Sequence, residues 1–296
     1  VMGQTVIELQ QKLGFEVAPV RHASDIPKSG ACIVNYDRLG LFDDVKVDAV
    51  VLDESSILKS HDGAYRRYIQ ERFRDVPYKL ACTATPAPND YMELGTHAEF
   101  VGAMTRAEML ATFFVHDGGD TSKWRLKRHA VSDFWQWVST WATVFSHPRD
   151  IGFDQPGFDL PELHIHDHRV DIELDLFDSA KVNATRVFQV LRDSSPERAK
   201  ITASIVAESD DPVIVWCNTN DEQDDIENAI PWLVGVRGSD SDSHKEDALC
   251  GFGNGKYNGI ITKPKIAGFG MNWQRCNRMV FCGVTYSFEQ VYQSIR

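Results

Sequence analysis

Short apolar runs alternate with helical patterns along most of the chain. Each apolar run is followed by polar or turn-forming residues, which is typical of a strand buried within a sheet. The predicted strands are 31–34, 45–52, 78–82, 212–217, 259–262 and 279–282. The predicted helices are 4–17, 65–73, 179–191, 197–208, 222–230 and 287–296. Strands separated by helices indicate an α/β fold with mostly parallel sheets, covered by helices on both faces.

Residues 98–160 break this alternation. They contain a glycine-bearing loop at 116–120 and a basic stretch at 123–128, and Pro and Gly residues recur between 148 and 161. A helical pattern in this segment carries the aromatic residues Phe134, Trp135, Trp137, Trp141 and Phe145. Their helical spacing favours packing in a core over stacking on nucleic-acid bases. We therefore expect an insertion and a linker here, between two α/β domains.

Length and composition are those of a two-domain protein. A chain of 296 residues, 43% of them hydrophobic, can bury two ordinary cores. No apolar run approaches the ~18 residues that a membrane-spanning helix needs, so we expect no membrane partner. The 6 cysteines have no Cys-x-x-Cys spacing and several lie in apolar runs, which indicates reduced core residues in a cytoplasmic protein.

The net charge bears on nucleic-acid binding. A formal net charge of −12 argues against a protein held to nucleic acid by a broad basic surface. A narrow basic channel is compatible with the same net charge, because phosphate contact depends on local groups. Composition therefore leaves nucleic-acid binding open.

Polar residues gather directly after two successive strands. Asp53 and Glu54 follow strand 45–52, and Thr83 and Thr85 follow strand 78–82. Ligands of parallel sheets bind outside the carboxyl ends of the strands. At a nucleoside triphosphate, one carboxylate can orient Mg²⁺ and the other can polarise the attacking water. An acidic pair alone is more often an ordinary turn, but hydroxyl residues at the next strand end can hydrogen-bond it and relay its state.

Three histidines alternate further along the chain. A strand would place His164, His166 and His168 on one face, where they could bind zinc. No cysteine accompanies them, so we favour an exposed strand face over a metal site.

The two acidic and hydroxyl segments resemble motifs of a helicase family. Val-Leu-Asp-Glu-Ser-Ser at 51–56 and Ala-Cys-Thr-Ala-Thr-Pro at 81–86 are similar to the second and third motifs of superfamily 2 helicases and translocases. The likeness is closest to the Swi/Snf-like branch of DEAD/DEAH-box-type helicases that is often found in phage and bacterial genomes.

Four further segments occur in the order expected for that family, one before the acidic motif and three after the threonine motif. Residues 33–37 resemble its nucleic-acid-contacting segment before the acidic motif, and 213–220 resemble the strand that opens its second lobe. Residues 260–274 resemble the fifth motif, and 288–296 resemble the start of the sixth, Gln-x-x-Arg-x-x-Arg. No segment is decisive alone, but their common order along nearly the whole chain is strong support.

The resemblance implies a fold. It predicts two RecA-like lobes of the P-loop NTPase helicase core, each with a mostly parallel sheet. The domains would be a partial first lobe at 1–97, an insertion and inter-lobe linker at 98–163, and a partial second lobe at 164–296. The family's phosphate-binding Gly-x-x-x-x-Gly-Lys-Ser/Thr loop does not occur in this sequence, and the sixth motif's second arginine would come after Arg296. We therefore expect a fragment of a larger enzyme, inactive on its own.

The resemblance also implies an activity. This is ATP-dependent translocation on, or unwinding of, nucleic acid, with DNA the expected kind, in the cytoplasm of a bacterium or of a phage-infected cell. ATP and Mg²⁺ are the expected cofactors, and fused or associated nuclease or methylase domains would be compatible with this role. Asp53 would orient Mg²⁺, and Glu54 would position or deprotonate the hydrolytic water. Thr83 and Thr85 would couple the ATP site to lobe movement.

The remaining site residues are assigned by the later motifs and by the segment before the acidic pair. They are Gly268, Gly270 and Asn272 at the ATP cleft, Gln293 and Arg296 as catalytic residues near the transferred phosphoryl group, and Asn35, Tyr36, Thr262 and Lys263 at the nucleic acid.

Two other functions stay open at this point. A non-catalytic nucleic-acid-binding module could share the fold without hydrolysis. A two-lobed nucleotide-sugar transferase is also built from α/β domains, but it would not need Thr-Ala-Thr-Pro at 83–86 followed by the Gln-x-x-Arg at 293–296.

Overall fold

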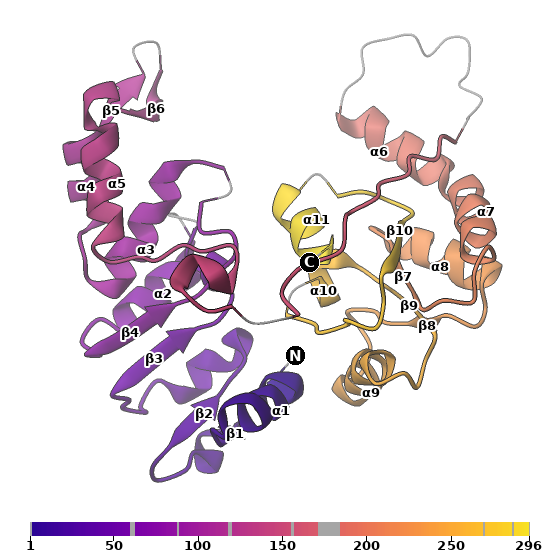
Figure 1. Cartoon of the computed structure of the whole chain (residues 1–296), viewed down its shortest axis with the longest axis horizontal. Coiled ribbons are helices and arrows are strands. Elements are labelled where there is room, and N and C mark those ends of the chain that lie inside the picture. The colour runs from indigo at the N-terminus through magenta and orange to yellow at the C-terminus, as the bar shows by residue number, and fades with distance from the viewer. Residues whose placement is uncertain are drawn as a thin grey trace. The chain divides into compact units, whose positions relative to one another are not determined.

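The chain folds into two compact α/β units. The computed structural model describes residues 2–59, 63–87, 89–117, 120–154, 157–170, 184–268, 270–285 and 287–295. The middle unit runs from Asp44 to Asp167, and the terminal unit combines Val1–Asp43 with His168–Arg296. Each unit contains parallel strands connected through helices, as Figure 1 shows, so the predicted α/β class with mostly parallel sheets is confirmed.

The middle unit begins with a parallel strand pair. β3 (Ala49–Leu52) pairs with β4 (Tyr78–Ala81), and Ala49 lies opposite Tyr78 in the register. Between the strands come the short helix η3 (Ser55–Leu58) and the helix α2 (Ala64–Arg72). A helical crossover of this kind is what a parallel pair requires.

The β3–β4 pair is covered on one face. Lys79 on β4 points toward α3 (Leu94–Val101), where its Nζ lies 5.9 Å from the centre of the Phe100 ring. The opposite face carries Val51 and Leu80, which are 62% and 53% exposed. Within the described residues, the prediction of a sheet covered on both faces is therefore wrong for this pair.

The rest of the middle unit is a helical cluster with one hairpin. Its elements are η4 (Tyr91–Glu93), α4 (Arg106–Phe113), β5 (Phe114–Asp117), β6 (Asp120–Leu126), η5 (Arg128–Ala130), α5 (Val131–Ser139) and η6 (Pro148–Ile151). The predicted glycine-bearing loop falls at the β5–β6 turn, where residues 118 and 119 lie outside the described residues. The predicted basic stretch belongs largely to β6.

Aromatic residues form the core of this cluster. Phe134 is fully buried, and its ring meets those of Phe113 and Phe114 edge-on at 5.5 and 5.6 Å. Packing was the predicted role of the aromatic helix, and for Phe134 it is confirmed. The helix α5 ends at Ser139, so Phe145 lies beyond it and is exposed.

The terminal unit starts with α1 (Met2–Leu13) and a small parallel pair. That pair is β1 (Val17–Pro19) with β2 (Ala31–Ile33), accompanied by η1 (Ala23–Asp25) and η2 (Tyr36–Phe42). The helix predicted to run to 17 ends earlier, because Gly14 takes a left-handed φ of 64°. There the Phe15 N–H donates to the Leu9 carbonyl at 3.2 Å, which closes the last turn.

A four-stranded parallel sheet forms the centre of the terminal unit. Its strands are β7 (Val213–Trp216), β8 (Val234–Gly235), β9 (Gly259–Thr262) and β10 (Arg278–Phe281), in the order β10-β7-β9-β8. Its helices are α6 (Ala184–Asp193), α7 (Ser195–Val206), α8 (Asn220–Ala229), α9 (Asp242–Gly253), α10 (Pro264–Ala267) and α11 (Phe288–Ile295). Of the predicted helix 179–191, the part before 184 lies outside the described residues.

Both faces of this larger sheet are covered. Val213 and Val215 pack with residues of α7 and α8, whereas Ile214 and Trp216 pack with residues of α9. All four residues of β7 are buried, as alternation in a central strand requires. The predicted two-sided covering is confirmed for this sheet.

Other expectations are corrected by the structure. The segment with His164, His166 and His168 is exposed and irregular, so the predicted strand there is wrong. All 6 cysteines are free, but Cys32 and Cys82 are exposed and are not core residues. No helix in the described ranges is long and apolar enough to cross a membrane.

Candidate functional site

The acidic turn follows β3 directly. Asp53 is exposed, and Glu54 has φ 50° and ψ 51°, in the left-handed region. Among the described residues, Glu54 is the one non-glycine residue with positive φ. This backbone conformation costs roughly 1–2 kcal/mol for a residue with a side chain, and such strain is concentrated at functional sites. The Glu54 N–H also donates to Asp53 Oδ1 at 3.1 Å.

The neighbouring strand fixes the position of this turn. The Cys82 N–H donates to the Leu52 carbonyl, and the Ser55 N–H donates to the Cys82 carbonyl, both at 2.8 Å. Partial desolvation raises the pKa of the Cys82 thiol, and the nearby Asp53 carboxylate raises it further. The acidic turn and the segment that begins at Thr83 are therefore adjacent, as their places after parallel strands predict.

The threonines of the second segment form a compact turn of their own. Thr83 is half-buried, and its Oγ1 accepts a hydrogen bond from the Thr85 N–H at 3.1 Å. Thr85 is buried. The two predicted coupling residues are thus joined to each other at the carboxyl end of β4.

Sequence reasoning missed one contact of the acidic turn. The Ser55 hydroxyl lies 3.3 Å from Nε2 of His97 on α3, and both side chains are buried. Burial lowers the pKa of His97, although the Glu93 and Ser55 carbonyls and the Glu93 charge act in the opposite direction. A signal was present, because His97 comes three residues after buried Leu94 and so shares the apolar face of its helix.

In the terminal unit, Asn35 and Tyr36 follow β2. Asn35 is exposed and begins η2, where its carbonyl accepts from the Arg38 N–H at 3.1 Å. Tyr36 is half-buried. Both predicted nucleic-acid residues thus lie at the carboxyl end of a parallel strand, where ligands of α/β sheets bind.

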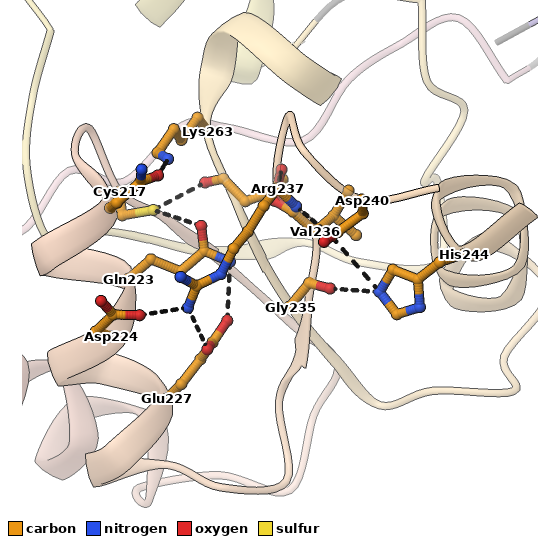
Figure 2. A network of polar contacts seen from close by, with 12 residues as sticks. Cys217, Gln223, Asp224, Glu227, Gly235, Val236, Arg237, Asp240, His244 and Lys263 are labelled. Atoms are coloured by element: carbon orange, nitrogen blue, oxygen red, sulfur yellow. Dashed lines mark hydrogen bonds and ion pairs between the residues drawn. The ribbon is translucent and has the colours of Figure 1, made fainter. Parts of the chain in front are cut away.

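Thr262 and Lys263 follow β9 but have different environments. Thr262 is fully buried, and its hydroxyl donates to the Val236 carbonyl at 3.1 Å. Lys263 is half-buried, and its Nζ donates to Oδ1 of Asn220 at the start of α8. In Figure 2, Lys263 lies beside Cys217, and these residues follow the carboxyl ends of β9 and β7. Of the two, Lys263 is the better placed for a phosphate.

Gly268 ends α10 where that helix meets α11. A Cβ at this position would lie 2.5 Å from the Pro264 carbonyl oxygen and 2.7 Å from Ser294 Oγ. The glycine is therefore required by close packing between two helices. Gly270 has a left-handed φ of 65°, and Asn272 Nδ2 donates to Glu8 Oε1 at 2.9 Å.

The segment similar to the sixth motif lies on α11. Gln293 is half-buried, and its Nε2 atom is buried without a hydrogen-bond partner among the described residues. Arg296 lies outside the described residues. The structure therefore locates Gln293 on α11 and does not describe Arg296.

A polar network near β8 was not predicted. Arg237 lies 2.6 Å from Asp224 Oδ1 and 2.5 Å from Glu227 Oε2, both on α8 (Figure 2). The hydrogen bond to Asp224, followed by that to Glu227, raises the pKa of Arg237. Gln223 Nε2 donates to Glu227 Oε1 at 2.8 Å. This arginine is already paired by two carboxylates and joins the end of β8 to α8.

A second ion pair, between Glu222 and Arg198, occupies the place in the sheet where the strand order reverses. Between β7 and β10, Glu222 is buried and lies 2.6 Å from Arg198 NH1. Its other oxygen accepts the Asn218 N–H at 2.6 Å. A Cβ at Gly283 would lie 2.5 Å from Glu222 Oε1. Ligands often bind at such a reversal, but here a side chain of the protein occupies it.

The described residues contain no group of three or more His, Cys, Asp and Glu that could hold a metal ion. Mg²⁺ is usually held by one or two carboxylates together with phosphate oxygens and water. An exposed Asp53 at a strand end fits that mode of binding. Two cavities, of about 400 and 790 Å³, are lined by none of the predicted site residues.

No protein-family model matches this chain, and a search of curated proteins finds no match. The likeness to helicases therefore depends on the segments quoted from the sequence. What it implies about function is a proposal.

Proposed function

We propose that this chain is part of an ATP-dependent helicase or translocase that acts on nucleic acid, with DNA the expected substrate. The observation that carries the proposal is the junction of two strand ends in the middle unit. There the Ser55–Cys82 backbone bond of 2.8 Å holds the acidic turn against the threonine turn. Two RecA-like lobes, with boundaries at 97 and 163, are part of the same proposal.

The acidic turn supports a division of labour between its carboxylates. Asp53 is exposed at the strand end and would hold Mg²⁺, which neutralises phosphate charge when bound. Glu54 is half-buried, and its backbone is held in a strained left-handed conformation. It would orient the hydrolytic water and accept its proton.

The terminal unit would supply the second half of the machinery. Lys263 would contact nucleic acid, and Gly268, Gly270 and Asn272 would line the nucleotide cleft. Gln293 and Arg296 would act on the transferred phosphoryl group. Hydrolysis would then change the grip of each lobe on the strand through a hinge-type switch.

The test compares Glu54→Gln with Asp53→Asn in the full-length protein. Glu54→Gln should abolish DNA-stimulated phosphate release while ATP binding persists, because shape and hydrogen bonding are kept but the base is lost. Asp53→Asn should weaken Mg²⁺-dependent ATP binding. Glu71→Gln is the matched control, since Glu71 is an exposed carboxylate on α2 of the same unit.

Three results would overturn the proposal. Wild-type turnover in Glu54→Gln would remove Glu54 from the reaction. DNA binding with no hydrolysis by the wild-type protein would favour a non-catalytic binding module. Binding of a nucleotide sugar in preference to ATP would favour a transferase.

A further inference from the structure

We propose that His97 is a positioning residue for ATP hydrolysis, which acts by holding the acidic turn through Ser55. This inference rests on the proposed function of Asp53 and Glu54. It concerns a side chain on α3, 43 positions after Glu54, that belongs to none of the segments similar to helicase motifs.

The acidic turn needs support from outside itself. Glu54 has a φ of 50°, which a glutamate adopts only when surrounding contacts hold it there. Ser55, the next residue, is fully buried and is tied to β4 through its N–H. Its hydroxyl lies 3.3 Å from His97 Nε2, which links this turn to α3.

Two acceptors lie around the His97 ring, the carbonyls of Glu93 and Ser55. Nδ1 lies 3.5 Å from the Glu93 carbonyl, and a hydrogen on Nδ1 satisfies that carbonyl. In this neutral tautomer, Nε2 has a lone pair that can accept the Ser55 hydroxyl proton. With His97 only 4% exposed, the neutral ring is favoured, because burial opposes charge.

The helix that carries His97 is itself held firmly. From α2, Gln70 Nε2 donates to the Thr96 carbonyl and to Glu99 Oε2, both at 3.3 Å. Arg66 NH1 lies 3.6 Å from Glu99 Oε2. Because α3 is anchored on α2, His97 presents a fixed acceptor to Ser55.

The expected consequence is kinetic. Without the bond, the backbone at Glu54 can relax out of its left-handed conformation and carry the carboxylate away from the water. A displacement of about 1 Å in a catalytic group can cost ~10²-fold in rate. ATP affinity should change little, because His97 is buried and acts on the turn through Ser55.

Four variants of the full-length protein test this. His97→Phe fills the volume without an acceptor, and Ser55→Ala removes the donor. Each should lower kcat by ~10- to 100-fold with KM for ATP within about twofold, and the double variant should be no worse than either. His97→Gln keeps an acceptor near the Nε2 position and should restore most of kcat.

The control is Thr96→Val on the same helix. Thr96 is equally buried and donates to the Glu93 carbonyl at 2.8 Å, so its loss disturbs α3 without touching Ser55. It should lower stability and leave kcat unchanged. If Thr96→Val lowered kcat as much as His97→Phe, or if His97→Phe left kcat unchanged, the positioning role would be refuted.

A second readout separates this inference from the proposed function. Hydrogen exchange at the Ser55 amide should be faster in His97→Phe than in the wild type and in Thr96→Val, even if the protein hydrolyses no ATP. Absence of wild-type hydrolysis would overturn the proposed function. Unchanged exchange at Ser55 in His97→Phe would overturn the role of His97 whatever the activity.

Discussion

The carboxyl ends of the two sheets differ in how their charged groups are used. After β3, an exposed Asp53 and a strained Glu54 stand at the sheet edge. After β7, Glu222 is buried against Arg198, and two backbone N–H groups point at its carboxylate. The fold places polar residues at both edges, but one arrangement suits chemistry and the other suits structural stability. Position at a strand end is therefore not enough to identify a site.

The largest expected effect is on the structural side of the comparison. Glu222→Ala should lower the free energy of unfolding by ~3–5 kcal/mol, because it leaves the half-buried Arg198 without its carboxylate partner and two backbone N–H groups without their acceptor. Urea denaturation of the wild type and variant measures this. Asp53→Asn, at the exposed edge, should cost less than ~1 kcal/mol in the same experiment. Equal losses at both positions would contradict the contrast.

A smaller loss is expected where α10 meets α11. Gly268→Ala should destabilise the protein by ~1–3 kcal/mol, since its methyl group would overlap the Pro264 carbonyl and Ser294 Oγ. The control is Gly238→Ala, because a Cβ at Gly238 meets nothing within 4 Å. Thermal denaturation of the two variants side by side decides the point, and similar melting temperatures would argue against tight packing at Gly268.

At the acidic turn, a substitution should stabilise the protein while removing activity. Glu54→Gly relieves the left-handed strain, and after the entropic cost of glycine a net gain of ~0.5–1 kcal/mol is expected. Ser56→Gly in the adjacent η3 should instead destabilise by a similar amount. Chemical denaturation of both tests whether Glu54 is strained, and a loss of stability in Glu54→Gly would speak against it.

The smallest effect is a pH dependence. Burial lowers the pKa of His97 below its ordinary value of 6.5, with Glu93 the nearby charged group acting against this shift. The unfolded chain therefore takes up a proton first, so the contribution of His97 is present above pH 6.5 and is lost as pH falls. Between pH 7.5 and 6 the loss should be under ~1 kcal/mol, and His97→Gln should abolish it. Identical pH profiles for both proteins would contradict this.

Much of the larger sheet could be predicted from sequence because its strands are wholly buried. The run at 259–262 matches β9 at both ends, since every residue of that strand is apolar or hydrogen-bonded within the sheet. The end of α1 was misplaced, because Val17 continues the helical spacing although Gly14 had already ended the helix. Hydrophobic spacing alone does not show where a glycine ends a helix.

The candidate site was predictable only where neighbouring strands determine it. Parallel pairing of β3 and β4 brings Glu54 close to Thr83, and this follows from the order of the segments. The Ser55–His97 bond joins residues 42 positions apart and leaves no local pattern. Glu222 and Gln223 lie in a helix that reads as a solvated acidic surface, yet both are buried. Pairing over such distances is a tertiary property.

The uncovered face of β3–β4 has a consequence for handling the protein. Val51, Tyr78 and Leu80 form an apolar strip there, and Tyr78 is 71% exposed. At neutral pH the net charge of −12 keeps copies apart by electrostatic repulsion. Near the isoelectric point of about 5.3 that repulsion vanishes, so the strip should drive precipitation. Purification and storage are therefore best kept well above that pH and at moderate salt.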